Sequence, residues 1–162
     1  MKTFHLLTPE VPGGLGPGTI LHREKSGFPV VTRLEYRFTD WLGDDLFESF
    51  PCFVVTERLA NRLKKKRPSI TGATFADLTV SLSPEFLEMN PDHQPMPNFV
   101  WLRVMGRPGI DDFGISEKYN LVVSDLVLRV LHEFNLNYCK KFAFPQDPSQ
   151  SHDLSEPMDD WP

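Results

Sequence analysis

One pattern occurs twice in this chain of 162 residues, and it constrains the fold more than any other feature. Residues 53–63 read FVVTERLANRL and residues 121–131 read LVVSDLVLRVL, at an offset of 68 positions. In each copy a short apolar run predicts a strand, and a hydroxyl residue, Thr56 or Ser124, follows where it can cap a helix. An acidic residue then stands in the first turn, where it complements the positive end of the helix dipole. The pattern predicts two strand–helix junctions of the same design.

Each predicted helix carries an apolar stripe at helical spacing. The first is expected to run from Thr56 to about Lys66, and the second from Ser124 to about Phe134. Strands are expected after each helix, over residues 75–82 and 138–144. Two interpretations stay open. The chain contains a duplicated strand–helix–strand unit, or any short strand–helix junction converges on this pattern of core and cap residues.

The remaining elements complete an α+β fold. Alternating or continuous apolar runs predict strands over residues 3–8, 30–38 and 99–105, and Ser83 can cap a single helical turn over residues 84–89. Residues 12–18 (PGGLGPG) predict a loop, as do residues 90–97 and 107–114. We therefore expect one α+β domain over residues 1–144, with a mixed, mostly antiparallel sheet of about six strands and two principal helices.

Charge is distributed unevenly along the chain. The net charge is −5, and residues 145–162 hold five acids and no Lys or Arg: Asp147, Asp153, Glu156, Asp159 and Asp160. This proline-rich, acidic segment is expected to be a flexible tail, and it leaves residues 1–144 with balanced charge. A neutral body argues against nucleic acid as a partner. No apolar run approaches the roughly 20 residues that span a bilayer, and no signal-peptide core is present, so we expect a cytoplasmic protein without membrane contact.

The familiar catalytic and metal-binding motifs are missing from the sequence. The five histidines form neither HxH nor HExxH, and Cys52 and Cys139 do not form CxxC, so both thiols are expected to be free. The adjacent pairs at residues 44–45 and 111–112 could supply two carboxylates, but a solvated turn is the simpler interpretation. We predict no catalytic residue, no metal and no cofactor, with an enzyme whose site is dispersed along the sequence as the alternative.

The two junctions carry a resemblance to a known group of proteins. The segments FPCFVVTERLANRL…SITGATF and EKYNLVVSDLVLRVLHEFNL resemble a recurring signature of bacterial immunity proteins that neutralise polymorphic toxins. The resemblance covers roughly residues 50–82 and 117–144, and it consists of core and cap residues, so no family site is carried over. It implies a protein that binds a cognate toxin domain encoded nearby and occludes or distorts its active site. A general interaction adaptor is a further alternative.

Residues 40–50 (DWLGDDLFESF) are the candidate contact with such a partner, because aromatic side chains alternate there with acids. Many toxins of this kind attack nucleic acids or nucleotides, and carboxylates can take the place of phosphates in a basic active site. The alternative is that the aromatic residues belong to the core. The predicted partner-binding residues are Asp40, Trp41, Asp44, Asp45, Phe47 and Glu48.

Overall fold

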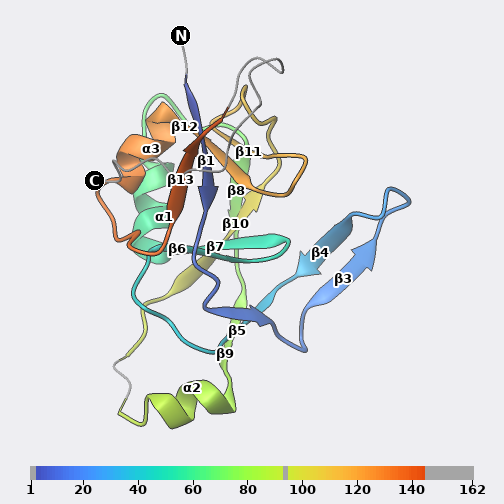
Figure 1. The fold of residues 1–162 in the computed structure, drawn as a ribbon, viewed down its shortest axis with the longest axis vertical. Coiled ribbons are helices and arrows are strands. Elements are labelled where there is room, and N and C mark those ends of the chain that lie inside the picture. The colour runs from blue at the N-terminus through green and yellow to red at the C-terminus, as the bar shows by residue number, and fades with distance from the viewer. Residues whose placement is uncertain (1–2, 93–94, 145–162) are drawn as a thin grey trace.

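The computed structural model describes residues 3–92 and 95–144 (Figure 1). This part of the chain contains three helices and thirteen mostly antiparallel strands, which confirms the α+β class. A single sheet of about six strands is wrong, because the strands divide among four small sheets. The predicted tail, residues 145–162, lies outside the described residues. No helix within the described ranges is long and apolar enough to cross a membrane.

Two four-stranded sheets form the body, and their strands follow the same order. In each sheet a hairpin pairs with a strand from elsewhere in the chain, which in turn pairs with the strand that follows the helix. Every neighbouring pair is antiparallel. The first sheet consists of β6 (Leu46–Ser49), β7 (Cys52–Thr56), β10 (Phe99–Val104) and β8 (Ala73–Ala76). The second consists of β11 (Phe113–Ile115), β12 (Leu121–Ser124), β1 (Phe4–Thr8) and β13 (Lys140–Ala143).

Both expected helices form, and both are shorter than predicted. Helix α1 spans Glu57–Lys64 and α3 spans Asp125–Leu131. Their capping hydroxyls act as expected: Thr56 accepts from the Leu59 amide and Ser124 from the Val127 amide. The helices end early because i→i+3 hydrogen bonds tighten the last turns, with the Phe134 amide donating to the Leu131 carbonyl at 3.1 Å. The two helices lie side by side over the body (Figure 1).

The apolar faces of these elements meet in one large core. It includes Leu59 and Leu63 of α1, Val127 and Leu131 of α3, and inward-facing residues of both sheets. Residues at helical spacing therefore bury one stripe of each helix, as their sequence predicts. A second, aromatic cluster lies against a third sheet, formed by β2 (Gly13–Leu15), β5 (Glu35–Phe38) and β9 (Thr79–Leu82). The single-turn helix capped by Ser83 is confirmed as α2 (Pro84–Met89).

Three local predictions are wrong. Residues 30–38 are split between β4 (Pro29–Arg33) and β5, and residues 75–82 between β8 and β9, so that each apolar run serves two different sheets. Alternation predicts a strand but carries no information on where the chain leaves one sheet for another. The glycine-rich run at residues 12–18, expected to be a loop, contributes β2. Gly13 lies so close to the Arg37 carbonyl that a Cβ atom there would overlap it.

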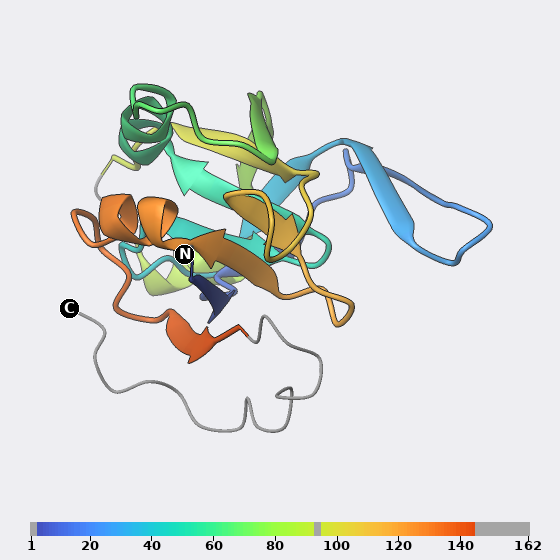
Figure 2. The same ribbon diagram turned by 90° about the horizontal axis from the view of Figure 1, so that it is seen from above.

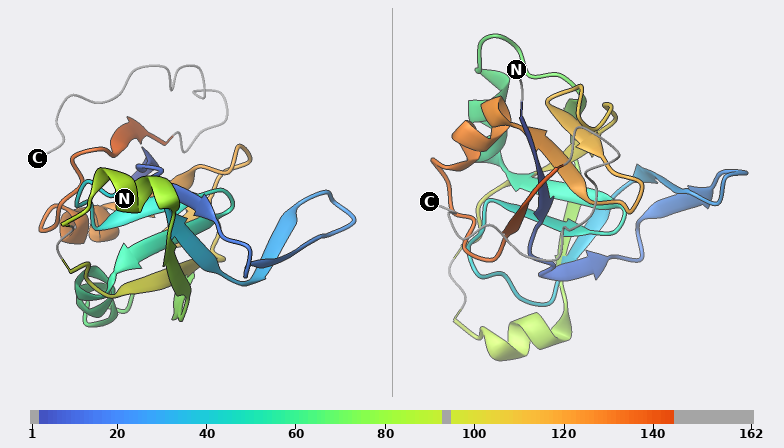
Figure 3. Two further views of the ribbon diagram at one scale, coloured as in Figure 1. Left: turned by 90° about the horizontal axis from the view of Figure 1, so that it is seen from below. Right: turned by 45° about the horizontal axis from the view of Figure 1, so that its top comes forward.

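A two-stranded sheet projects from the body. Strands β3 (Ile20–Arg23) and β4 pair with each other, and no third strand joins them among the described residues. Figures 2 and 3 show this hairpin standing away from the body in every view. Its turn depends on Gly27, whose φ of +84° lies in the left-handed region that glycine adopts without steric cost. All four residues of β3 are exposed, whereas β4 buries Val31 in the aromatic cluster.

Candidate functional site

The predicted partner segment, residues 40–50, is largely internal. Asp44, Asp45 and Phe47 are fully buried, whereas Asp40, Trp41 and Glu48 are half-buried. Phe47 packs against Tyr36 and Phe38 in the aromatic cluster, with ring centroids 5.0 and 5.4 Å away. An exposed patch that includes Asp44, Asp45 and Phe47 is therefore wrong, and the alternative of a core position is confirmed for Phe47.

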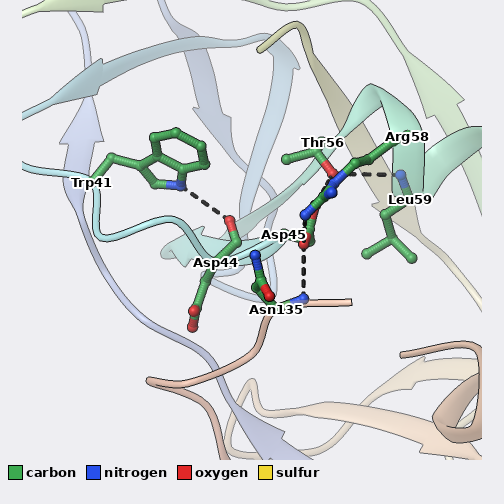
Figure 4. Close-up of polar contacts among 7 residues, drawn as sticks. All are labelled: Trp41, Asp44, Asp45, Thr56, Arg58, Leu59 and Asn135. Carbon is green, nitrogen blue, oxygen red and sulfur yellow. Dashed lines mark hydrogen bonds and ion pairs between the residues drawn. The ribbon is translucent and has the colours of Figure 1, made fainter. Parts of the chain in front are cut away.

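Asp45 is buried because the chain surrounds its carboxylate with donors (Figure 4). One oxygen accepts from the Thr56 hydroxyl and from Nε of Arg58, the latter at 2.7 Å. The other accepts from Nη2 of Arg58 at 2.7 Å and from the Asn135 amide at 2.9 Å. The carboxylate thus joins the cap of α1 to the loop that follows α3, two segments far apart in the sequence.

Asp44 is held in the same manner by backbone groups. Its two oxygens accept from the amides of Asn137 and Tyr138, each at 2.9 Å. The indole N–H of Trp41 donates to the Asp44 carbonyl at 3.0 Å, which folds the tryptophan back onto its own loop (Figure 4). Charge in this segment therefore stabilises the loops around β13. A partner contact through Asp40, Trp41 and Glu48 stays a prediction.

Asp112 is the counterpart of Asp45 in the second sheet. Its carboxylate accepts from the Ser124 hydroxyl at 2.7 Å, and from the amide and hydroxyl of Thr71 at 2.9 and 3.1 Å. Each buried aspartate thus joins the cap of one helix to the loop that follows the other helix. The solvated-turn interpretation is wrong for Asp44, Asp45 and Asp112, because hydrogen bonds within the protein replace those to water.

A sequence signal for these aspartates was present. Residues 44–49 read DDLFES and residues 111–116 read DDFGIS, which extends the repeated pattern upstream of both capped helices. The offset here is 67 positions, one fewer than at the caps, because the stretch from Asp112 to Ser124 is one residue longer than the stretch from Asp45 to Thr56. Comparing the residues that precede the two strands would have indicated that the aspartates belong to the repeated framework.

Glu48 provides a pH-dependent test of this region. Burial raises the pKa of its carboxyl from 4.5 to about 7. Because the folded chain binds this proton more tightly than the unfolded chain does, the associated stability is present below pH 4.5 and is lost as the pH rises through about 7. We expect Glu48→Gln to be more stable than the parent at about pH 8, with the difference vanishing at about pH 4.

Urea unfolding at a series of pH values would measure this difference. Glu88→Gln, which changes an exposed glutamate of α2, is the matched control and should follow the parent at every pH. A Glu48→Gln curve that also runs parallel to the parent over the whole range would contradict a raised pKa.

Three aromatic rings meet where the hairpin contacts the β6–β7 and β11–β12 turns. Tyr119, in the β11–β12 turn, lies 5.2 Å from Phe28 of the hairpin and 4.8 Å from Phe50 of the β6–β7 turn, between ring centroids. Phe28 and Phe50 are about half exposed, at 50% and 54%. Tyr119 has a φ of +63°, a conformation that costs a non-glycine residue about 1–2 kcal/mol. Its ring contacts are thus made in a backbone conformation that the residue itself disfavours.

A groove runs beside these rings. Its walls come from residues 29–31 of the hairpin, residues 51–53 at the start of β7, and residues 101–104 of β10, with Ile115 and Tyr119 at the side. We call this surface the hairpin groove. Its volume is about 190 Å³. A cavity of about 150 Å³ can hold benzene, so the groove accommodates one large apolar side chain and is small for a substrate pocket.

One cation stands in the hairpin groove. The guanidinium of Arg103 lies over the Trp101 ring, with Cζ 4.8 Å from the centroid, because alternate residues of β10 share a face. Trp101 is buried and Arg103 is exposed. None of the salt bridges among the described residues includes Arg103. Its guanidinium therefore retains the capacity to bind a carboxylate from outside.

Chemistry elsewhere in the described chain is sparse. Nε2 of His5 lies 2.7 Å from Oδ1 of Asp125, which ties β1 to the first turn of α3. Cys52 and Cys139 are both free, as predicted. Both are buried, and burial raises the pKa of each thiol to about 12. Within residues 3–92 and 95–144, no group of three or more His, Cys, Asp or Glu side chains is placed to hold a metal ion.

No family model, curated protein sequence or solved structure matches this chain.

Proposed function

We propose that this protein is a cytoplasmic immunity protein, which binds a cognate bacterial toxin domain encoded nearby and blocks its active site. The resemblance of the two strand–helix junctions to immunity proteins supports this function. The observation that carries it is the projecting hairpin, with half-exposed apolar residues on a segment that stands away from the core. Exposed apolar side chains on a protruding element are typical of a surface that binds another protein.

The position of the hairpin in the chain supports separate roles for the two parts of the protein, a stable framework and a binding element. The two four-stranded sheets have the same strand order, the same capping chemistry and equivalent buried aspartates, and we propose that they derive from a duplicated unit. The hairpin lies outside this repeated framework, between β2 and β5. A rigid framework that carries a variable, protruding element would allow such a protein to match one particular toxin.

The hairpin also presents apolar side chains in the arrangement expected of an interface centre. Ile20, Leu21 and Phe28 are exposed by 53%, 39% and 50%, and Phe50, exposed by 54%, adds a further ring that contacts Tyr119. Protein interfaces concentrate their binding energy in a few aromatic or arginine anchors near the centre. The hairpin groove offers both, through its three aromatic rings and Arg103.

The test is co-expression with the toxin-domain protein encoded beside this one, with cell survival as the readout. The parent should protect, and Phe28→Asp should reduce binding to the purified toxin domain by about tenfold or more. Leu87→Asp, which changes an equally exposed apolar residue of α2, is the matched control and should protect like the parent. Cell death with the parent rejects the proposed function, and equal binding by both variants rejects the hairpin as the interface.

A further inference from the structure

We propose that the hairpin groove recognises an acidic segment of the toxin domain, with an aromatic side chain in the groove and flanking carboxylates on Arg103 and Lys118. This inference rests on the proposed function and specifies the chemistry of the partner. Three observations carry it: the size of the groove, the free cation inside it, and the charge of the segments around it.

The volume and lining of the groove favour an aromatic side chain as the partner group that enters it. About 190 Å³ bounded by proline, valine and aromatic side chains matches one aromatic side chain of a partner. Trp101 forms part of this lining, and the rings of Phe28, Phe50 and Tyr119 stand at its rim. An inserted ring would contact them edge to face, as aromatic pairs prefer.

Arg103 favours a negatively charged group in the partner, next to the aromatic side chain that enters the groove. The guanidinium lies over the Trp101 ring at the groove, and Arg103 is exposed, so the charged group is accessible to an acceptor from outside. A planar guanidinium binds a carboxylate through two parallel hydrogen bonds, which fixes orientation as well as charge. Lys118 is exposed and adjacent in sequence to Tyr119, and it is the second cation that we propose for this contact.

The surrounding charge agrees with this choice. The whole hairpin (residues 20–33) and the other segments that contribute to the groove, residues 49–53, 101–104 and 115–119, carry five cations and two acids. They are therefore positive in a chain whose net charge is −5. The cations are Arg23, Lys25, Arg33, Arg103 and Lys118, and the acids are Glu24 and Glu117. Complementary charge steers an acidic partner to this face and disfavours a basic one.

Labelled synthetic peptides test the inference without the toxin. The probe is a nonapeptide with one central phenylalanine flanked by two aspartates on each side and padded with glycine and serine. Two matched peptides replace the aspartates with asparagine or the phenylalanine with alanine. Fluorescence polarisation with the full chain should show about tenfold tighter binding of the probe than of either matched peptide. High salt should abolish the preference over the asparagine peptide, because it screens charge, and should leave the preference over the alanine peptide.

Variants of the full chain locate the binding. Arg103→Gln should weaken probe binding by about tenfold, whereas Arg129→Gln, at an exposed cation of α3, should leave it unchanged. Thermal melting verifies that both variants are folded, and Lys118→Gln provides a second, milder substitution at the rim. Equal binding of the three peptides, or equal binding by the Arg103 and Arg129 variants, overturns the inference.

One competing occupant has the same chemistry. The chain itself carries Asp159, Asp160 and Trp161 near its C-terminal end. A variant of the full chain that carries Asp159→Asn, Asp160→Asn and Trp161→Ala distinguishes this occupant from a segment of the toxin domain. Unchanged probe affinity supports a partner segment, and clearly tighter binding of the probe would assign the groove to the chain's own residues. Survival in co-expression together with failure of the peptides would reject this inference and leave the proposed function standing.

Discussion

Replacing Asp45 with alanine is expected to lower the free energy of unfolding by roughly 2–4 kcal/mol, because it removes the acceptor for several donors at once. The fully buried carboxylate accepts from Thr56, Arg58 and the Asn135 amide. The Thr56 hydroxyl would be left inside the protein without this acceptor. The Arg58 side chain is 60% exposed and can return to water, which keeps the loss below that for a pair of buried charges.

Urea denaturation with a constant slope would measure the change, and hydrogen exchange would localise it. The Asn135 amide should lose protection in Asp45→Ala more than amides of the hairpin do. The control is Asp77→Ala, since Asp77 is exposed between β8 and β9, and its substitution should change stability by less than about 0.5 kcal/mol. Equal midpoints for the two variants would mean that the Asp45 contacts contribute nothing.

Leu131→Ala in α3 is expected to cost about 2–5 kcal/mol, because it opens a cavity in the main core. Leu131 is 1% exposed and packs in the cluster that joins both helices to both sheets. Leu126→Ala is the matched control, with the same change on the same helix at a half-buried position, and should cost about 1 kcal/mol. The comparison isolates burial from helix propensity. If the two variants melt at the same urea concentration, the buried face of α3 is assigned incorrectly.

Neither core change touches the hairpin groove. Both variants should therefore retain probe affinity at temperatures where they remain folded. Phe28→Asp and Arg103→Gln should show the opposite behaviour, with impaired binding and little change in stability. Measuring stability and probe binding for all four variants therefore distinguishes residues that stabilise the fold from residues that bind the partner.

Much of the local structure followed from short stretches of sequence. The strands that end at Thr56 and Ser124, the hydroxyl caps of all three helices and the apolar stripes of α1 and α3 were predicted from the residues themselves. Capping and periodicity act over a few residues, so neighbouring positions contain the information that determines them. The balanced charge of residues 1–144 was equally readable from composition.

Contacts between residues far apart in the sequence determined which acids are buried, how the strands divide among sheets and where the groove lies. Whether Asp45 faces water or the interior depends on donors brought from Asn135, 90 positions away. Whether residues 30–38 form one strand or two depends on the sheets that receive them, and the hairpin groove combines side chains from four separate parts of the chain. The sequence by itself determined the two capped helices and the strands that precede them, because capping and periodicity are local. The tertiary structure alone determined which acids are buried and where a groove opens, because both depend on partners that only folding brings together.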